Sequence, residues 1–339
     1  MWTLWNMNIW SYFVKKNKRI GFTTSFPVEV VFAAGHFPID LNNLFLDCDS
    51  TQMIHAAELK GFPRTVCGWI KGNYSTALAS NLDEVIGITQ GDCSNAQSLL
   101  DMIAEEGIPV WSFSFPNRRT HEDMDRELRR LEEHYEVDRA DTLKAKARLD
   151  EIRRKLLVLD EWTWNQRLVT GKENHLWLVS SSDFNGDPDR FEGELDAFMQ
   201  EAAKRDPMPA KPRCAFLGVP PIYRDMYDLV RDLGGDVVFN EVQRQFAMPH
   251  LAEDIVEQYL LYTYPYTIKE RLEDILPQLQ QRKVDLVLSY IQSFCHLQID
   301  NILLKKYTGL PFLTLEGDQP EPMDNRALLR LESFFEVHS

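Results

Sequence analysis

The feature that most constrains the fold is a repeated alternation of short apolar runs, turns and helical segments along the chain. Runs of this length that are rich in β-branched residues are typical of buried strands. Parallel strands need a crossover between them, and a helix usually supplies it. The alternation therefore predicts an α/β protein with parallel sheets. The expected strands are 19–24, 84–89, 108–115, 214–219, 237–240, 284–288 and 312–315.

A charged segment rich in helix-forming residues separates two such α/β parts. Residues 117–161 carry apolar side chains at helical spacing among many charges, which predicts two amphipathic helices. The proline-rich stretch 206–212 is the best linker in the chain. We therefore expect two Rossmann-like domains, 1–118 and 206–339, with a helical segment at 119–205 between them.

Composition and charge exclude some classes of protein. The formal net charge of -15 argues against nucleic-acid binding, which needs Lys and Arg to neutralise phosphates. No run approaches the roughly 20 apolar residues that span a bilayer. The apolar N-terminus lacks the features of an export signal and is expected to form a docked helix with Trp2 and Trp5 on one side. Five scattered cysteines fit free thiols or metal ligands in a reducing compartment, so we expect a cytoplasmic protein.

Cysteines stand at similar places in both α/β parts. The stretch 286–298, LVLSYIQSFCHLQ, is predicted to be a buried strand and a short turn, followed by a helix that opens at Cys295 and His296. Open α/β sheets keep their ligand sites beyond the carboxyl ends of strands. A thiol at a helix N-terminus is also biased towards the reactive thiolate. Because Cys67 and Cys93 likewise follow a break and precede a helix, we expect three thiols to meet in the cleft between the two halves.

Three thiolates in one cleft suit an iron–sulfur cluster. Three ligands rather than four leave one iron open to substrate, in the way that catalytic zinc sites keep an open position. A metal-free site is the alternative, because the spacing contains no C-x-x-C pair and a buried cysteine is commonly just a small apolar side chain. Cys214, which starts an apolar run, is expected in the core, and Cys48, between two aspartates, is expected in an exposed loop.

Six motifs follow one another from about residue 19 to the C-terminus. They are GFTTSFPVEVVFAAGHFPIDLNN, GFPRTVCGWIKGNY, GDCSN, SSSDFNGDP, QSFCHLQID and LEGDQPEPMDNR. In these motifs the chain resembles the 2-hydroxyacyl-CoA dehydratase family. That family includes the D-component of 2-hydroxyglutaryl-CoA dehydratase and the small subunits of benzoyl-CoA reductase.

The resemblance implies a [4Fe-4S] cluster held by Cys67, Cys93 and Cys295, which stand in the matching motifs. It implies an enzyme, a lyase that eliminates water from an (R)-2-hydroxyacyl-CoA. One electron enters the thioester carbonyl, and the resulting ketyl radical anion expels the 2-hydroxyl group. The implied partners are the acyl-CoA substrate, a homologous second subunit or a second copy, and an ATP-hydrolysing iron–sulfur activator. The chain has no G-x-x-x-x-G-K-[ST] phosphate loop, which is consistent with an external electron donor.

Other polar residues of the motifs are candidates for the site. Glu29 lies in an apolar helix, where a carboxylate needs a partner or a raised pKa, and it is a candidate catalytic residue. His296 is the second catalytic candidate, with helix capping or support of a ligand as the alternative role. Arg64 suits a carboxylate or a CoA phosphate and is, with Lys71, a candidate for substrate binding. A surface ion pair is the alternative for Arg64, and Asp318 is a weaker candidate.

Other functions stay open at this point. A benzoyl-CoA-reductase-like subunit fits the same motifs. A double-cubane reductase needs about six thiolates if three hold each cubane, and the chain has five cysteines. A non-catalytic partner subunit has no physical use for the three motif cysteines, and a metal-free binding protein is the remaining possibility. The acyl group, the choice between homodimer and heterodimer, and the direction of the reaction cannot be predicted from the sequence.

Overall fold

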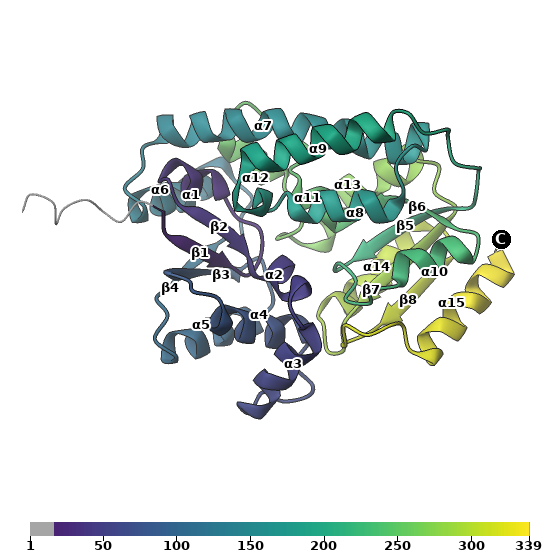
Figure 1. The fold of residues 1–339 in the computed structure, drawn as a ribbon, viewed down its shortest axis with the longest axis horizontal. Helices are drawn as coiled ribbons and strands as arrows, with labels where there is room; N and C mark the ends of the chain where they lie inside the picture. Colours follow the sequence, from purple (N-terminus) through teal and green to yellow (C-terminus); the bar gives the residue numbers. More distant parts are fainter. Residues whose placement is uncertain (1–16, 339) are drawn as a thin grey trace, which may run out of the picture.

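Two four-stranded sheets form the centre of the protein. The structure is a computed structural model that describes residues 17–338. The strands are β1 (Arg19–Phe22), β2 (Phe37–Asp40), β3 (Glu84–Gln90), β4 (Val110–Ser114), β5 (Arg213–Gly218), β6 (Asp236–Asn240), β7 (Leu286–Ile291) and β8 (Phe312–Glu316). The strand orders are β2-β1-β3-β4 and β6-β5-β7-β8, and all neighbouring strands pair in parallel (Figure 1). The predicted α/β fold with two Rossmann-like domains is confirmed. The helix predicted in residues 1–16 lies outside the described residues.

Five helices cover or flank the first sheet. They are α1 (Val28–Ala33), α2 (Leu41–Asp47), α3 (Ser50–Leu59), α4 (Gly68–Ala79) and α5 (Asn95–Glu105). The last of these shows why the local sequence is helical: Leu99, Leu100 and Ile103 recur at helical spacing and are buried against the sheet. The stretch 37–46, in which the sequence mixes strand and turn signals, is strand β2 followed directly by α2. The Asp40 side chain caps α2 by accepting a hydrogen bond from the Asn42 amide.

The second sheet has the same topology and a core on each face. Its helices are α10 (Met226–Asp232), α11 (Glu241–Phe246), α13 (Ile268–Gln281), α14 (Leu297–Thr308) and α15 (Asn325–His338), and α12 (Ile255–Leu261) lies between α11 and α13 in the chain. Every residue of β7 is buried, as expected for a central parallel strand covered on both faces. Leu288 and Tyr290 pack in the cluster on one face, and Val287 packs in the cluster on the other.

The helical segment between the sheets bridges both of them. It consists of α6 (His121–His134), α7 (Arg139–Glu161), the π-helical turn η2 (Trp162–Gln166), α8 (Gly171–Ser180), the short η3 (Phe184–Gly186) and α9 (Pro188–Ala202). The two predicted amphipathic helices are α6 and α7, whereas the sequence analysis assigned no helix to α8. Helix α7 packs on α1 of the first domain, and α8 packs on α11 and β6 of the second (Figure 1).

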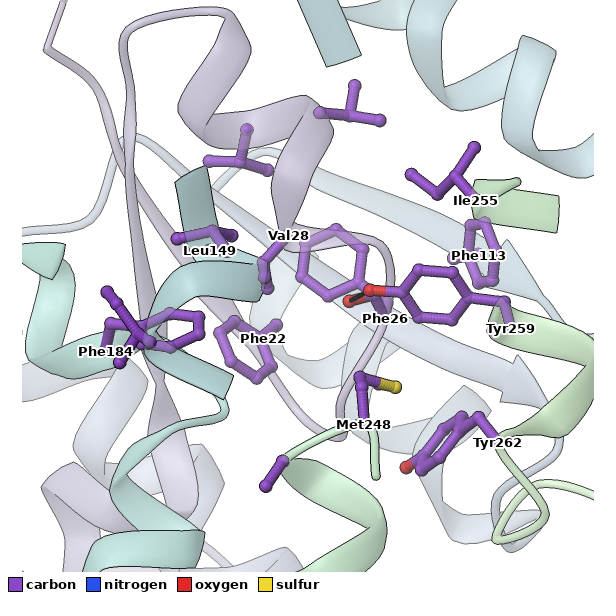
Figure 2. Packing of buried hydrophobic residues seen from close by; sticks show 14 of the residues in the cluster. Phe22, Phe26, Val28, Phe113, Leu149, Phe184, Met248, Ile255, Tyr259 and Tyr262 are labelled. Carbon is purple, nitrogen blue, oxygen red and sulfur yellow. Dashed lines mark hydrogen bonds between the residues drawn. The ribbon is translucent and has the colours of Figure 1, made fainter. Parts of the chain in front are cut away.

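The largest core cluster is built from distant parts of the chain. Figure 2 shows Phe26 and Phe113 of the first domain in the same cluster as Leu149 of α7 and Ile255 and Tyr259 of α12. Helix α12 thus follows β5 and β6 of the second domain in sequence, but it packs in the core of the first domain. Residues 206–212 contain no helix or strand, and the domain boundary predicted at residue 206 stays a prediction, because the packing of the two halves is interleaved across it.

Candidate functional site

A cavity of about 360 Å³ lies between the carboxyl ends of the two sheets. In each sheet the second strand lies on one side of the first strand and the later strands lie on the other side. The strand order therefore reverses between β1 and β3 and between β5 and β7. Open α/β sheets bind ligands at such switch points. Residues that follow these four strands line the cavity: 23–25, Asp92 and Cys93, Val219 and Pro220, and 292–297. Both switch points therefore open into one shared cavity.

The three motif cysteines all line this cavity, and each stands at the start of a helix. Cys67 is the N-cap of α4 and makes no capping hydrogen bond through its side chain. Cys93 comes two residues before α5, and Cys295 two residues before α14. All three are partly exposed. The positive ends of three helix dipoles thus lie beside the three sulfur atoms and favour thiolates there.

Burial acts against the helix dipoles and raises the pKa of each of the three thiols. Burial raises the pKa of Cys67 to about 12, although a hydrogen bond from the Ile70 amide opposes the shift. Burial, together with the nearby Asp92 carboxylate, raises the pKa of Cys93 to about 11. Burial also raises the pKa of Cys295. A metal that bound these cysteines as thiolates would have to displace their protons.

Hydrogen bonds join the loop that carries Cys295 to the start of α4 and to the loop after β8. The Gly68 amide, directly after Cys67, donates to Gln292 Oε1 at 2.6 Å. The Ser293 amide donates to Asp318 Oδ1 at 2.9 Å. A Cβ atom at Gly68 would lie 2.6 Å from the Asp318 carbonyl oxygen. Glycine is needed here because the start of α4 closely approaches the loop after β8.

Of the remaining predicted site residues, His296 lines the cavity, whereas Arg64 and Lys71 do not. His296 lines the cavity and is exposed. Arg64 is exposed and does not line the cavity, although the next residue, Thr65, does. Lys71 is buried on α4, away from the cavity lining, and pairs with Glu58 at 2.8 Å. The geometry supports a position at the site for His296 and assigns Lys71 a buried ion pair instead.

Glu29 has partners in the first domain's core. Its carboxylate pairs with Arg153 at 2.8 Å and accepts a hydrogen bond from the Tyr259 hydroxyl at 2.6 Å. Gln258 Nε2 donates to the same carboxylate at 3.1 Å. Glu29 does not line the cavity. The structure thus shows the partners that a carboxylate in an apolar helix needs, and the catalytic role of Glu29 stays a prediction.

Several polar residues of the cavity wall were missed by the sequence analysis. Asp40 lines the cavity, and its carboxylate accepts a hydrogen bond from Ser182 Oγ at 2.6 Å. The Asp40 amide donates to Asp183 Oδ2 at 2.7 Å. Ser182 and Asp183 belong to the SSSDFNGDP motif, which was the available signal. His175, on the unassigned helix α8, also lines the cavity, and no sequence pattern indicated it.

A comparison with protein families agrees with the motifs. The model of the 2-hydroxyglutaryl-CoA dehydratase D-component family matches residues 23–337. The chain belongs to that family. As a D-component family member it is a dehydratase-type subunit, and the component designation implies that it works with a partnering component. Residues 17–338 include no helix that is long and apolar enough to cross a membrane.

Other comparisons add no functional information to the family assignment. No curated protein matches the chain. Two matching structures are of the SBP FpvC from Pseudomonas aeruginosa, one with Mn2+ and one with Ni2+. Each is 15% identical to this D-component family member over 95% of its length, with 98% and 97% of the FpvC chain covered and a TM-score of 0.23. A TM-score this low supports no argument about function.

The donor set of the cavity fits the iron–sulfur cluster that the family implies. Within residues 17–338 no three His, Cys, Asp or Glu side chains are close enough together to hold a single metal ion. A four-iron cluster does not require such a group, because its cysteines bind different irons. Cys67, Cys93 and Cys295 would supply sulfur ligands from two domains, and hydrogen bonds from helix-start amides favour their thiolate forms.

Proposed function

We propose that this protein is the iron–sulfur subunit of a 2-hydroxyacyl-CoA dehydratase and eliminates water from an (R)-2-hydroxyacyl-CoA. The observation that carries the proposal is the meeting of Cys67, Cys93 and Cys295 in one cavity, at the switch points of both sheets. In this proposal the three cysteines hold a [4Fe-4S] cluster. When bound, the cluster supplies low-potential one-electron chemistry, which is needed because the β-proton of the substrate is not acidic.

The other wall of the cavity is suited to an acyl group with polar substituents. Thr24, Asn42 and Asn43 line it together with the apolar side chains of Leu46 and Val179. The cavity volume of about 360 Å³ is at the small end of the range of ligand pockets. We therefore assign the acyl end of the substrate to the cavity and leave the nucleotide end of CoA outside it.

The proposal includes an external electron donor and a second subunit. The chain lacks a phosphate loop, which supports an ATP-hydrolysing iron–sulfur activator as a separate protein. Phe294 and His296 line the cavity and are exposed, so the cysteine-bearing loop after β7 is accessible to such a donor. A cytoplasmic location is part of the same proposal, because the cluster requires a reducing compartment.

The first test is anaerobic purification followed by iron and sulfide analysis and EPR of the reduced protein. About four irons per chain are expected, with loss of iron in Cys67→Ala, Cys93→Ala and Cys295→Ala, because each removes one ligand. The matched controls are Cys214→Ala in the core of β5 and Cys48→Ala outside the cavity lining, and both should retain iron. Zinc or no metal in the wild-type protein contradicts the proposal.

The activity test uses the activator, ATP and 2-hydroxyacyl-CoA thioesters with the reconstituted pair of subunits. Water elimination that depends on all three cysteines supports the dehydratase. Reduction of an aromatic CoA thioester instead identifies a benzoyl-CoA-reductase-like subunit. Bound iron without activity in any reconstituted complex identifies a partner subunit. The position of Cys214 in the core argues against a second cubane.

A further inference from the structure

His175 is a buried residue of the cavity wall that none of the roles above uses. It lies on α8, is 7% exposed and lines the cavity opposite the cysteine loops. Helices α8 and α11 are packed together (Figure 1). Four polar side chains between these helices and the second sheet form a connected hydrogen-bond network that ends on His175.

The direction of the network is set by a backbone carbonyl. Asn240 Nδ2 donates to the Gly171 carbonyl oxygen at 3.0 Å and to Asn174 Oδ1 at 2.7 Å. A carbonyl oxygen only accepts hydrogen bonds, so the amide of Asn240 has a single possible orientation. Asn240 Oδ1 therefore faces the Tyr227 hydroxyl, which donates to it at 2.8 Å.

The same logic determines which nitrogen of His175 carries the proton. The Tyr227 hydroxyl has given its only proton to Asn240 and accepts from Gln243 Nε2 at 3.2 Å. Gln243 Nε2 also lies 3.2 Å from His175 Nδ1 and donates to it. Because Nδ1 accepts, the neutral ring has its proton on Nε2. Within residues 17–338 the hydrogen bond to His175 is made at Nδ1 and none is made at Nε2, and His175 is one of the residues that line the cavity.

Packing keeps the imidazole neutral and holds its plane. Burial, and to a smaller extent the charge of Lys172, lowers the pKa of His175 to about 3. The ring lies against that of Tyr227 with centroids 4.9 Å apart and an interplanar angle of 30°. No carboxylate in residues 17–338 hydrogen-bonds to the ring. The Nε2–H group is therefore an uncharged donor, held in place by packing, on a residue that lines the cavity.

We propose that His175 Nε2–H binds the carbonyl oxygen of an acyl thioester in this cavity, with Gln243 as the positioning residue that sets the tautomer. The assignment rests on the proposed function in that the ligand is a CoA thioester. A neutral donor binds a carbonyl oxygen without protonating it, and its hydrogen bond strengthens as that oxygen gains negative charge.

The tautomer is tested without any ligand or activity. Long-range 1H–15N NMR of the full-length chain, assigned with His175→Gln, is expected to show a proton on Nε2 and none on Nδ1 from pH 5 to 9. Gln243→Glu places a carboxylate beside Nδ1 and should protonate that nitrogen, whereas Gln280→Glu, an exposed change of the same kind on α13, should not. A proton on Nδ1 in the wild-type protein, or an unchanged spectrum in Gln243→Glu, overturns the assignment.

The ligand is tested by binding of three probes: 2-hydroxyglutaryl-CoA, glutaryl-CoA, and the thioether analogue in which a methylene replaces the carbonyl. His175→Ala should weaken binding of both thioesters about tenfold, the effect of one hydrogen bond, and leave the thioether unchanged. His175→Gln, which retains a donor, should recover part of the loss. Equal losses for all three probes, or a loss confined to the hydroxylated one, overturn the carbonyl assignment. If the wild-type protein binds none of the three probes, both the carbonyl assignment and the proposed function are overturned. The NMR experiment decides the tautomer independently of this result.

Discussion

At the scale of single residues, Asp40 of the cavity wall is hydrogen-bonded to a second buried acidic residue, Asp183. Asp40 and Asp183 are both buried, and the amide of one donates to the carboxylate of the other. Burial and the neighbouring Asp40 raise the pKa of Asp183 to about 7. Burial raises the pKa of Asp40 as well. Burial therefore favours the uncharged forms of both carboxyl groups.

The Asp183 shift predicts a pH dependence of stability. The folded state binds this proton more tightly than the unfolded state, so the contribution to stability is complete below about pH 4 and is lost as pH rises through about 7. Relative to Asp183→Asn, the wild-type free energy of unfolding should fall by up to about 1.4 kcal/mol per pH unit over that window. Urea denaturation from pH 4 to 8 measures it. The exposed control Asp189→Asn should follow the wild type, and a difference that does not change with pH contradicts the prediction.

At the scale of elements, three helix starts define the site, and α4 is held most closely. Its first residue, Gly68, both donates across the domains to Gln292 and has no room for a side chain beside the Asp318 carbonyl. Cys67 immediately precedes it. A small displacement of α4 therefore moves one of the three thiols away from the other two.

Gly68→Ala is expected to reduce iron binding although it leaves all cysteines in place. The added Cβ meets a backbone oxygen at 2.6 Å, which forces α4 away from the second domain. Iron per folded chain after anaerobic reconstitution is the measurement. Gly193→Ala is the matched control, because its Cβ meets nothing within 4 Å in α9 and should stabilise the helix by about 0.5–1 kcal/mol. Normal iron content in Gly68→Ala shows that this close approach does not position the ligand.

At the scale of the whole molecule, the interleaved core joins the halves that form the cavity. Arg153 of α7 pairs with Glu29 of α1, and Tyr259 of α12 donates to the same carboxylate. Segments from all three sequence regions thus converge on one buried ion pair. Removing one partner of such a pair leaves an uncompensated buried charge.

Glu29→Ala should lower the free energy of unfolding by about 3–5 kcal/mol, while iron per folded chain stays normal because Glu29 lies outside the cavity lining. Chemical denaturation and iron analysis of the same samples measure both quantities. Glu122→Ala, whose side chain is 88% exposed beside Arg126, is the control and should change stability by less than about 1 kcal/mol. A stable Glu29→Ala protein that has lost activity would contradict this structural role and support the catalytic role predicted from sequence.

The sequence by itself determined the α/β class, the parallel sheets and the set of motif cysteines. These follow from local patterns, because strand and helix periodicity and the position of a cysteine after a strand are properties of short segments. Tertiary structure decided which polar residues reach the cavity. Glu29 and Lys71 look reactive in sequence, but their charges are neutralised by Arg153 and Glu58.

Conversely, His175 lies in a helix without a motif, and its tautomer depends on side chains from α11 and β6. The shared cavity, the position of α12 in the first domain's core and the pairing of Asp40 with Asp183 join residues that are far apart in the chain. Such contacts depend on how two domains pack together, which no local pattern encodes.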